Sequence, residues 1–190
     1  MGILISKCIN RKQRSVVFIG TPGSGKKDII KILRKDKKDT PASEMYEQFT
    51  VRGGGYSTEV YDVSDEQKHI NFWKFYTENC HLVVFVVNIC TEANIMQAKE
   101  AFENFFTSYG MNKESIVFLL KTEPLPKESE LSEESRRAAD EEAQRKTAAF
   151  VQAFASISGL DKKALSRNLL VSEATKRSQI VSFVCKNFMQ

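Results

Sequence analysis

The sequence contains no long hydrophobic run. Its longest apolar stretch, residues 82–87, is far shorter than the roughly 20 residues that a membrane-spanning helix needs. The apolar residues Ile3–Ile5 near the start are too few for the hydrophobic region of a secretory signal. We therefore expect neither a membrane-spanning segment nor secretion.

Cysteine and histidine are scarce, and their spacing excludes a zinc or redox motif. The four cysteines stand at positions 8, 80, 90 and 185, without any C-x-x-C pattern. His69 and His81 have no companions at metal-ligand spacing, so we expect them to be surface or packing residues. These features indicate a reduced, intracellular protein. With no internal repeat or low-complexity linker, the 190 residues suit one globular domain.

Apolar stretches alternate with amphipathic ones along the chain. The predicted strands are Ser15–Ile19, Glu47–Val51, Tyr56–Val63, Leu82–Ile89, Ile116–Leu120 and Leu169–Val171. The predicted helices cover Lys26–Lys35, the apolar stripe from Ile95 to Phe106, the charged segment Ser132–Ile157 and the amphipathic end from Ile180 to Phe188. Within Ser132–Ile157, Glu141/Arg145 and Glu142/Lys146 stand at helical i,i+4 spacing. This order predicts an α/β fold with helices on both faces of a mostly parallel, six-stranded sheet, with one antiparallel edge strand from the hairpin around residues 53–55.

The strongest motif lies directly after the first predicted strand and before the first helix. Residues 20–26 match the phosphate-binding pattern G-x-x-x-x-G-K. They are Gly20, Thr21, Pro22, Gly23, Ser24, Gly25 and Lys26. Glycines let the backbone bend around a phosphate and point its N–H groups inward, and the lysine reaches the β- and γ-phosphates. We expect this loop to bind a nucleotide.

The residue after this motif is Lys27, where a serine or threonine hydroxyl ordinarily ligates Mg²⁺. An ammonium group cannot ligate a metal ion and repels it. It supplies part of the ion's charge against the phosphates, without the coordination geometry. Mg²⁺-dependent binding is therefore in doubt.

The remainder resembles the Arf-like branch of the small GTPases over nearly the whole chain. Residues 60–68 and then Phe72-Trp73 are similar to the family pattern T-V-W-D-V-G-G-Q-D-K-I-R-P-L-W. Residues 40–43 fall where the family has T-I-P-T, and residues 82–88 match its G-L-I-F-V-V-D. Met1-Gly2 completes the likeness. The resemblance implies the P-loop small-GTPase fold over residues 15–190, after a lipidated, basic segment at residues 1–14.

The resemblance also implies roles for residues near the phosphates, some of them altered. Asp62 and Ser43 stand where the family holds Mg²⁺, through a carboxylate and a switch I hydroxyl. Asp65 replaces the glycine whose backbone N–H binds the γ-phosphate, and its charge opposes that phosphate. Glu66 replaces the catalytic glutamine that orients water and lacks its amide donor. We expect impaired GTP hydrolysis.

Guanine selection in the family depends on N-K-x-D after a buried strand. Lys121 and Glu123 match this motif best, with Glu123 as the reader of the base. An ungapped alignment instead places Pro124 at the aspartate and leaves no reader. Ala174 lies where the last family loop contacts the guanine carbonyl through its backbone. The implied ligands are GTP and GDP.

The N-terminus fits the myristoylation pattern at Gly2, with Cys8 and nearby basic residues as a second membrane signal. We expect a cytoplasmic protein held peripherally on intracellular membranes. The resemblance implies a monomer whose switch and interswitch surface binds an effector protein, with Trp73 either in that surface or packed inside. No interleaved aromatic residues mark a nucleic-acid platform.

Three functions fit these motifs. The first is an Arf-like GTP-binding regulator of intracellular trafficking, with weak or absent hydrolysis. The second is a pseudoGTPase that serves as a constitutive protein-binding scaffold. A P-loop kinase of small molecules is the third, and no acceptor-site or lid-arginine pattern supports it.

Overall fold

The computed structural model describes residues 12–34, 43–53, 55–109, 116–122, 132–157, 160, 165, 169–172 and 177–188. Its six strands are β1 (Lys12–Gly20), β2 (Tyr46–Gly53), β3 (Tyr56–Val63), β4 (Leu82–Asn88), β5 (Ile116–Lys121) and β6 (Leu169–Ser172). They form one sheet in the order β2-β3-β1-β4-β5-β6. All pairings are parallel except that of β2 with β3, so the predicted sheet with one antiparallel edge strand is confirmed.

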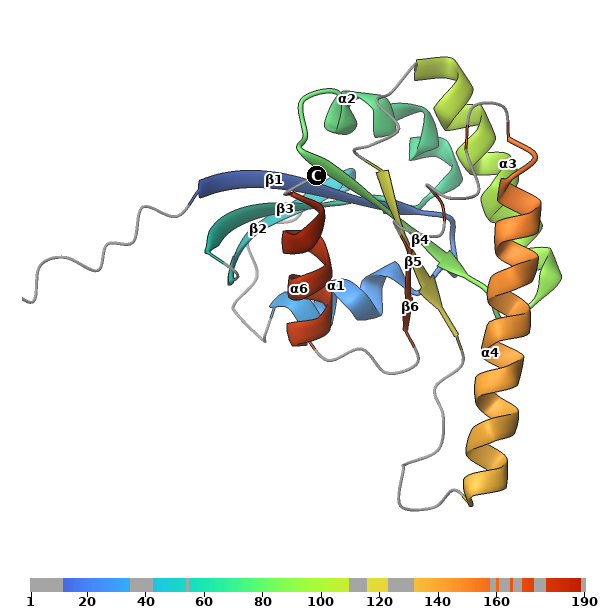
Figure 1. Ribbon diagram of the computed structural model, residues 1–190. Coiled ribbons are helices and arrows are strands. Elements are labelled where there is room, and N and C mark those ends of the chain that lie inside the picture. The colour runs from blue at the N-terminus through green and yellow to red at the C-terminus, as the bar shows by residue number, and fades with distance from the viewer. Residues whose placement is uncertain are drawn as a thin grey trace, which may run out of the picture.

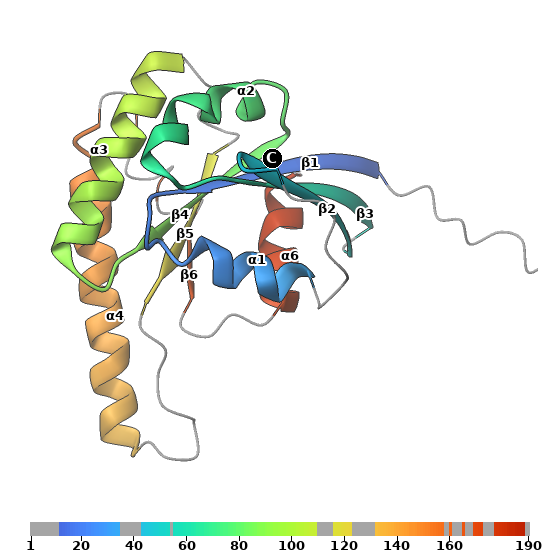
Figure 2. The same ribbon diagram turned by 180° about the vertical axis from the view of Figure 1, so that it is seen from behind.

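Helices cover both faces of this sheet, as predicted. They are α1 (Lys26–Arg34), the 3₁₀ helix η1 (Gln67–Phe72), α2 (Trp73–Thr77), α3 (Glu92–Tyr109), α4 (Glu133–Phe154) and α6 (Arg177–Asn187). Helices α1 and α6 lie together on one face, while α2, α3 and α4 lie on the other (Figures 1 and 2). The sequence patterns predicted neither η1 nor α2.

Strand β1 begins at Lys12, three residues before the predicted strand. Residues Lys12–Arg14 were expected in the N-terminal segment, yet they pair with Tyr56–Thr58 of β3. Their side chains are exposed or half-buried, so no apolar pattern marks them as a strand. Backbone hydrogen bonds to the hairpin extend the strand here, because a ladder does not require apolar side chains.

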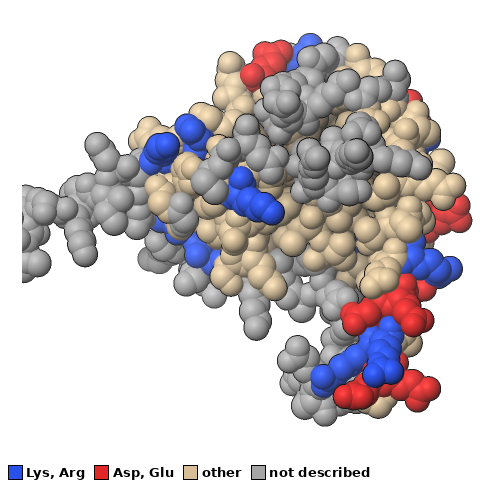
Figure 3. Space-filling view, in the orientation of Figure 1, with Lys and Arg blue, Asp and Glu red and all other residues tan. Residues whose placement is uncertain are grey.

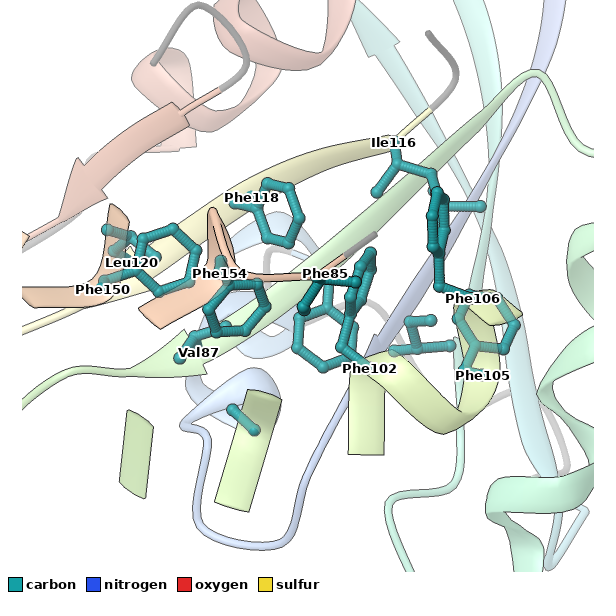
Figure 4. Close-up of a cluster of buried hydrophobic side chains, with 14 of the residues drawn as sticks. Phe85, Val87, Phe102, Phe105, Phe106, Ile116, Phe118, Leu120, Phe150 and Phe154 are labelled. Carbon is teal, nitrogen blue, oxygen red and sulfur yellow. The ribbon is translucent and has the colours of Figure 1, made fainter. Parts of the chain in front are cut away.

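Phenylalanine dominates the core between the sheet and helices α3 and α4. Phe85 and Phe118 project from β4 and β5 toward Phe102 of α3 and Phe154 of α4 (Figure 4). The Phe85 and Phe102 rings lie 5.0 Å apart at 72°, an edge-to-face arrangement that adds to simple burial. The predicted apolar stripe of α3 is therefore confirmed as a core face.

The charged first part of α4 extends away from this core. None of the side chains at residues 132–149 is buried, and acidic and basic residues cover this end of the helix (Figure 3). Arg145 donates to Glu142 at 2.8 Å, and Lys146 lies 3.4 Å from the same carboxylate. Glu142 thus pairs with both cations. The predicted pair of Glu142 with Lys146 forms, whereas Arg145 pairs with Glu142 and not with the predicted Glu141. Of the described helices, none is long and apolar enough to cross a membrane.

Candidate functional site

The sheet topology gathers the predicted site residues at one edge. Parallel strands end on the same side, so Gly20, Asp62, Asn88 and Lys121 all lie at or near the carboxyl ends of β1, β3, β4 and β5. The loop from Gly20 leads into α1 at this edge (Figure 2). The structure therefore brings together residues that are far apart in the chain.

The phosphate loop has the glycine-dependent conformation that its motif predicts. Gly23 and Gly25 have φ values of +76° and +80°, which favour glycine. A Cβ on Gly20 would stand 2.7 Å from the Val86 carbonyl oxygen, so this position also needs glycine. The buried Ser24 hydroxyl has no hydrogen-bond partner among the described residues. Such an unsatisfied group in this loop is consistent with a ligand site.

Lys26 is buried and forms an ion pair with Asp62. The lysine is only 2% exposed and the aspartate 12%, so the pair is shielded from water. Burial raises the pKa of Asp62, while the Lys26 ammonium acts in the opposite direction. The two residues that motif analysis assigned to phosphate and metal therefore hold each other.

Lys121 lies across the phosphate loop. A Cβ on Gly25 would stand 2.1 Å from Lys121 Cδ, so glycine makes room for the lysine chain. The ammonium pairs with Asp28 in the first turn of α1, and because Asp28 is 68% exposed this pair adds little stability. Its position fits a lysine that borders a base next to the loop. Glu123, the expected base reader, Pro124, which takes its place in the ungapped alignment, and Ala174 lie outside the described residues.

Asn88 ties β4 to the phosphate loop, a role that the sequence analysis missed. Its side-chain amide donates to the Gly23 carbonyl at 3.1 Å, and its carbonyl accepts from the Cys90 N–H at 2.9 Å. Both partners are backbone groups, so they fix the orientation of the amide. A polar residue ending an apolar strand at this edge was the available signal.

The residues at the predicted Mg²⁺ position do not fit this ion. The Ser43 hydroxyl donates to the Tyr46 carbonyl and accepts from the Met45 and Tyr46 N–H groups, while Asp62 pairs with Lys26. Lys27 lines the same pocket, of about 150 Å³. Mg²⁺ requires near-octahedral oxygen coordination, which this set does not offer. Across the described part of the chain, no other cluster of His, Cys, Asp or Glu could hold a metal ion.

The same pocket is lined by Asp65 and Glu66. Both belong to the segment that corresponds to switch II of the family, which here runs from Ser64 through η1 and α2. The exposed Glu66 carboxylate lies 3.1 Å from Lys68 Nζ. Its hydrogen bond to this ammonium lowers the pKa of Glu66, which makes the carboxylate a weaker base. Glu66 therefore has no amide donor, and its paired carboxylate is a weaker base than a free one.

Switch II is anchored through Ser64 and Trp73. The Trp73 indole donates to the Ser64 carbonyl at 3.1 Å, and His69 Nδ1 lies 2.9 Å from the Ser64 hydroxyl. Trp73 is fully buried against Phe85 and Phe105, so the packing alternative is correct. His69 is buried too, as the expected packing residue.

The neighbouring Phe72 and Phe75 face solvent instead. They are 39% and 59% exposed, and their rings lie 6.1 Å apart. A different hollow, of about 680 Å³, lies along α4 and Val171 of β6, and none of its lining residues that the structure describes belongs to the predicted nucleotide site.

Comparisons with known proteins agree with the fold. The sequence profile of the ADP-ribosylation factor family matches residues 1–171. The small COPII coat GTPase SAR1 of Encephalitozoon cuniculi (strain GB-M1) is 24% identical over 115 residues, which are 60% of this chain and 51% of that protein. The chain thus matches about half the length of this curated relative.

The structure of the Arl6 BBS3 small GTPase from Trypanosoma brucei with bound nucleotide analogue GppNp has the same fold. It superposes with a TM-score of 0.60 at 16% identity, covering 94% of this chain and 99% of that one. The family profile covers most of the chain and includes the phosphate loop, switch II and strands β1 to β5. The chain belongs to the ADP-ribosylation factor family of small GTPases.

Proposed function

We propose that the protein binds a guanine nucleotide at its phosphate loop and hydrolyses GTP weakly or not at all. The observation that carries this proposal is the intact loop, with its positive-φ glycines, the buried Lys26 and Lys121 lying over Gly25. Family membership supports guanine as the base. The poor base at Glu66 and the acidic Asp65 support weak hydrolysis.

Binding of mant-GDP, a fluorescent GDP derivative, tests this function. We expect saturable binding that GDP displaces and ADP does not, and the loss of binding in Lys26→Met. Single-turnover assays with GTP then measure hydrolysis. Displacement by ADP as readily as by GDP would contradict guanine selection, and rapid phosphate release would contradict the impaired chemistry.

The second candidate is a constitutive protein-binding scaffold with the small-GTPase fold. It is favoured by the contacts that hold switch II in place and by its exposed aromatic rings. Ser64 links this segment to Met45 at the start of the hairpin, with a backbone bond of 2.8 Å, and to Trp73. The exposed Phe72 and Phe75 provide an aromatic surface for a partner protein. Partner binding that persists in nucleotide-free Lys26→Met would support this candidate, while partner binding that requires nucleotide would support a switch.

Family membership also supports peripheral membrane association, through myristoylated Gly2 and the adjacent Cys8. One acyl chain binds a bilayer only marginally, so both signals contribute. Co-expression with an N-myristoyltransferase, mass spectrometry and flotation with anionic liposomes test this proposal. We expect the modified protein to float and Gly2→Ala to stay soluble; an unmodified Gly2 in this assay would contradict the assignment.

A further inference from the structure

Lys27 supplies a second ammonium group to the phosphate pocket. It follows Lys26 in the first turn of α1, is exposed, and lines the pocket together with Lys26 and Asp62. Lys26 is neutralised by Asp62, whereas Lys27 forms no ion pair within the described ranges and acts on the Glu66 carboxylate only at longer range. Its positive charge therefore remains available to an anion at the start of this helix.

The oxygen groups that would hold a metal ion here are already engaged. Ser43 Oγ makes hydrogen bonds of 3.0 to 3.2 Å with the Met45 and Tyr46 backbone, and Lys26 holds the Asp62 carboxylate. A lysine ammonium offers three N–H donors and a positive charge without any demand for octahedral ligands. Lys27 thus supplies one positive charge and three N–H donors to a diphosphate without metal-ion geometry.

The lining of the pocket also contains five carboxylates. They are those of Glu44, Glu47, Asp62, Asp65 and Glu66. Arg34, Lys26 and Lys68 neutralise Glu47, Asp62 and Glu66. Asp65 and Glu44 have no ion-pair partner among the described residues, and Asp65 lies near enough to Asp62 to oppose its ionisation. A third phosphate in this pocket would meet the like charges of Asp65 and Glu44.

From these three observations we propose that the site selects a nucleoside diphosphate over a triphosphate and binds it without Mg²⁺, with the Lys27 ammonium in place of the metal ion. This inference rests on the proposed function, because it assumes that the phosphate loop binds a guanine nucleotide. It adds which phosphate form is bound and which residues decide it. Lys27 acts on the diphosphate, and Asp65 acts against the third phosphate.

Dissociation constants for mant-GDP and mant-GTP, each measured in excess EDTA and in excess MgCl₂, test this inference. For the unmodified protein we expect mant-GDP affinity to differ by less than about twofold between the two buffers, and mant-GTP to bind at least about tenfold more weakly. Mg²⁺-dependent binding of mant-GDP, or equal affinity for mant-GTP, would overturn the inference and leave guanine-nucleotide binding intact. No binding of either nucleotide in either buffer would overturn the proposed function itself.

Three variants test separately whether Lys27 acts on the diphosphate and whether Asp65 acts against the third phosphate. Lys27→Met should weaken mant-GDP binding about tenfold in both buffers. Lys27→Thr should weaken it similarly in both, because Ser43 and Asp62 stay engaged and one added hydroxyl does not complete an Mg²⁺ site. Asp65→Gly should narrow the gap between mant-GTP and mant-GDP. Unchanged affinity in Lys27→Met, with native tryptophan fluorescence as the control for folding, would show that Lys27 does not act on the phosphates.

Discussion

Single side chains decide how the phosphate edge is held together in the free protein. Lys26 and Asp62 stand 36 residues apart in the chain and form a shielded ion pair. An ion pair with so little exposure has lost most of its hydration, so each partner depends on the other. Any anion that recruits Lys26 must therefore compete with Asp62.

We expect Lys26→Met to lower the free energy of unfolding of the nucleotide-free protein by about 3 kcal/mol at neutral pH, because it leaves the Asp62 carboxylate buried without a partner. Burial already raises the pKa of Asp62, and the loss of Lys26 raises it further. When the pKa of Asp62 is higher in the folded than in the unfolded protein, its contribution to the free energy of unfolding is fully present below the unfolded pKa. That contribution is lost as the pH rises through the folded pKa. The destabilisation should therefore shrink toward mildly acidic pH.

Urea unfolding at neutral and at mildly acidic pH measures this effect. Lys27→Met is the matched control, since it removes an exposed ammonium one residue away and should change stability by less than about 0.5 kcal/mol. The same destabilisation by Lys26→Met at both pH values would contradict the account of Asp62.

Glu66 gives a second prediction at the residue scale. The double variant Asp65→Gly/Glu66→Gln should raise the rate of single-turnover GTP hydrolysis about tenfold or more. The glycine lets its backbone N–H reach the γ-phosphate, and the glutamine amide supplies a donor to the transition state. Lys68→Ala is the control: it removes the ammonium that lowers the pKa of Glu66 but supplies no amide. An equal gain in Lys68→Ala would show that basicity, not the amide, limits hydrolysis.

At the scale of elements, strand ends position the site and helix faces fill the core. The side chain of Asn88 connects the end of β4 to the loop that follows β1, and Lys121 reaches from β5 to the start of α1. The phosphate loop, which follows β1, is therefore also held by side chains from β4 and β5. Loss of one such contact should loosen the loop and leave the sheet intact.

Asn88→Asp tests this arrangement, because aspartate still accepts the Cys90 N–H but cannot donate to the Gly23 carbonyl. We expect GDP affinity to fall about fivefold, equivalent to the net worth of one hydrogen bond of about 1 kcal/mol. Asn104→Asp makes the same chemical change at an exposed position on α3 and should leave GDP affinity unchanged. Equal affinity in Asn88→Asp and the unmodified protein would rule out a positioning role for Asn88.

Helices η1 and α2 place Trp73 in the core and Phe72 and Phe75 at the surface. Trp73→Ala should lower the free energy of unfolding by about 3–5 kcal/mol, because it empties a fully buried site next to Phe85 and Phe105. Phe75→Ala should change it by less than about 0.5 kcal/mol, since this ring is mostly exposed. Denaturant unfolding distinguishes the two, and a large loss in Phe75→Ala would place that ring in the core.

The elements show what sequence patterns can and cannot predict. Alternating and unbroken apolar runs predicted all six strands. A strand buried on both faces is apolar throughout, and a strand buried on one face alternates apolar with polar residues. The patterns missed η1 and α2, whose short turns follow from the anchoring of Trp73 and His69 on Ser64. They also missed the role of Asn88, because it depends on a contact with Gly23, 65 residues away in the chain.

For the molecule as a whole, ligand binding and stability are coupled. A ligand that binds only the folded state stabilises it by about 2.7 kcal/mol at a hundredfold excess over the dissociation constant. For a chain of this size, GDP should therefore raise the melting temperature by about 5–10 °C. Thermal unfolding with GDP, with ADP and with neither measures this shift, and an equal shift from ADP would contradict base selection.

We propose above all that this member of the ADP-ribosylation factor family retains a working guanine-nucleotide site at its phosphate loop. Calorimetric titration of the purified protein with GDP and with ADP, in EDTA and in Mg²⁺, is the decisive experiment. We predict one GDP bound per chain in either buffer, no heat from ADP, and no heat from GDP with Lys26→Met. A folded protein that releases no heat with GDP in either buffer would contradict the claim, and the chain would then act through its switch surface alone.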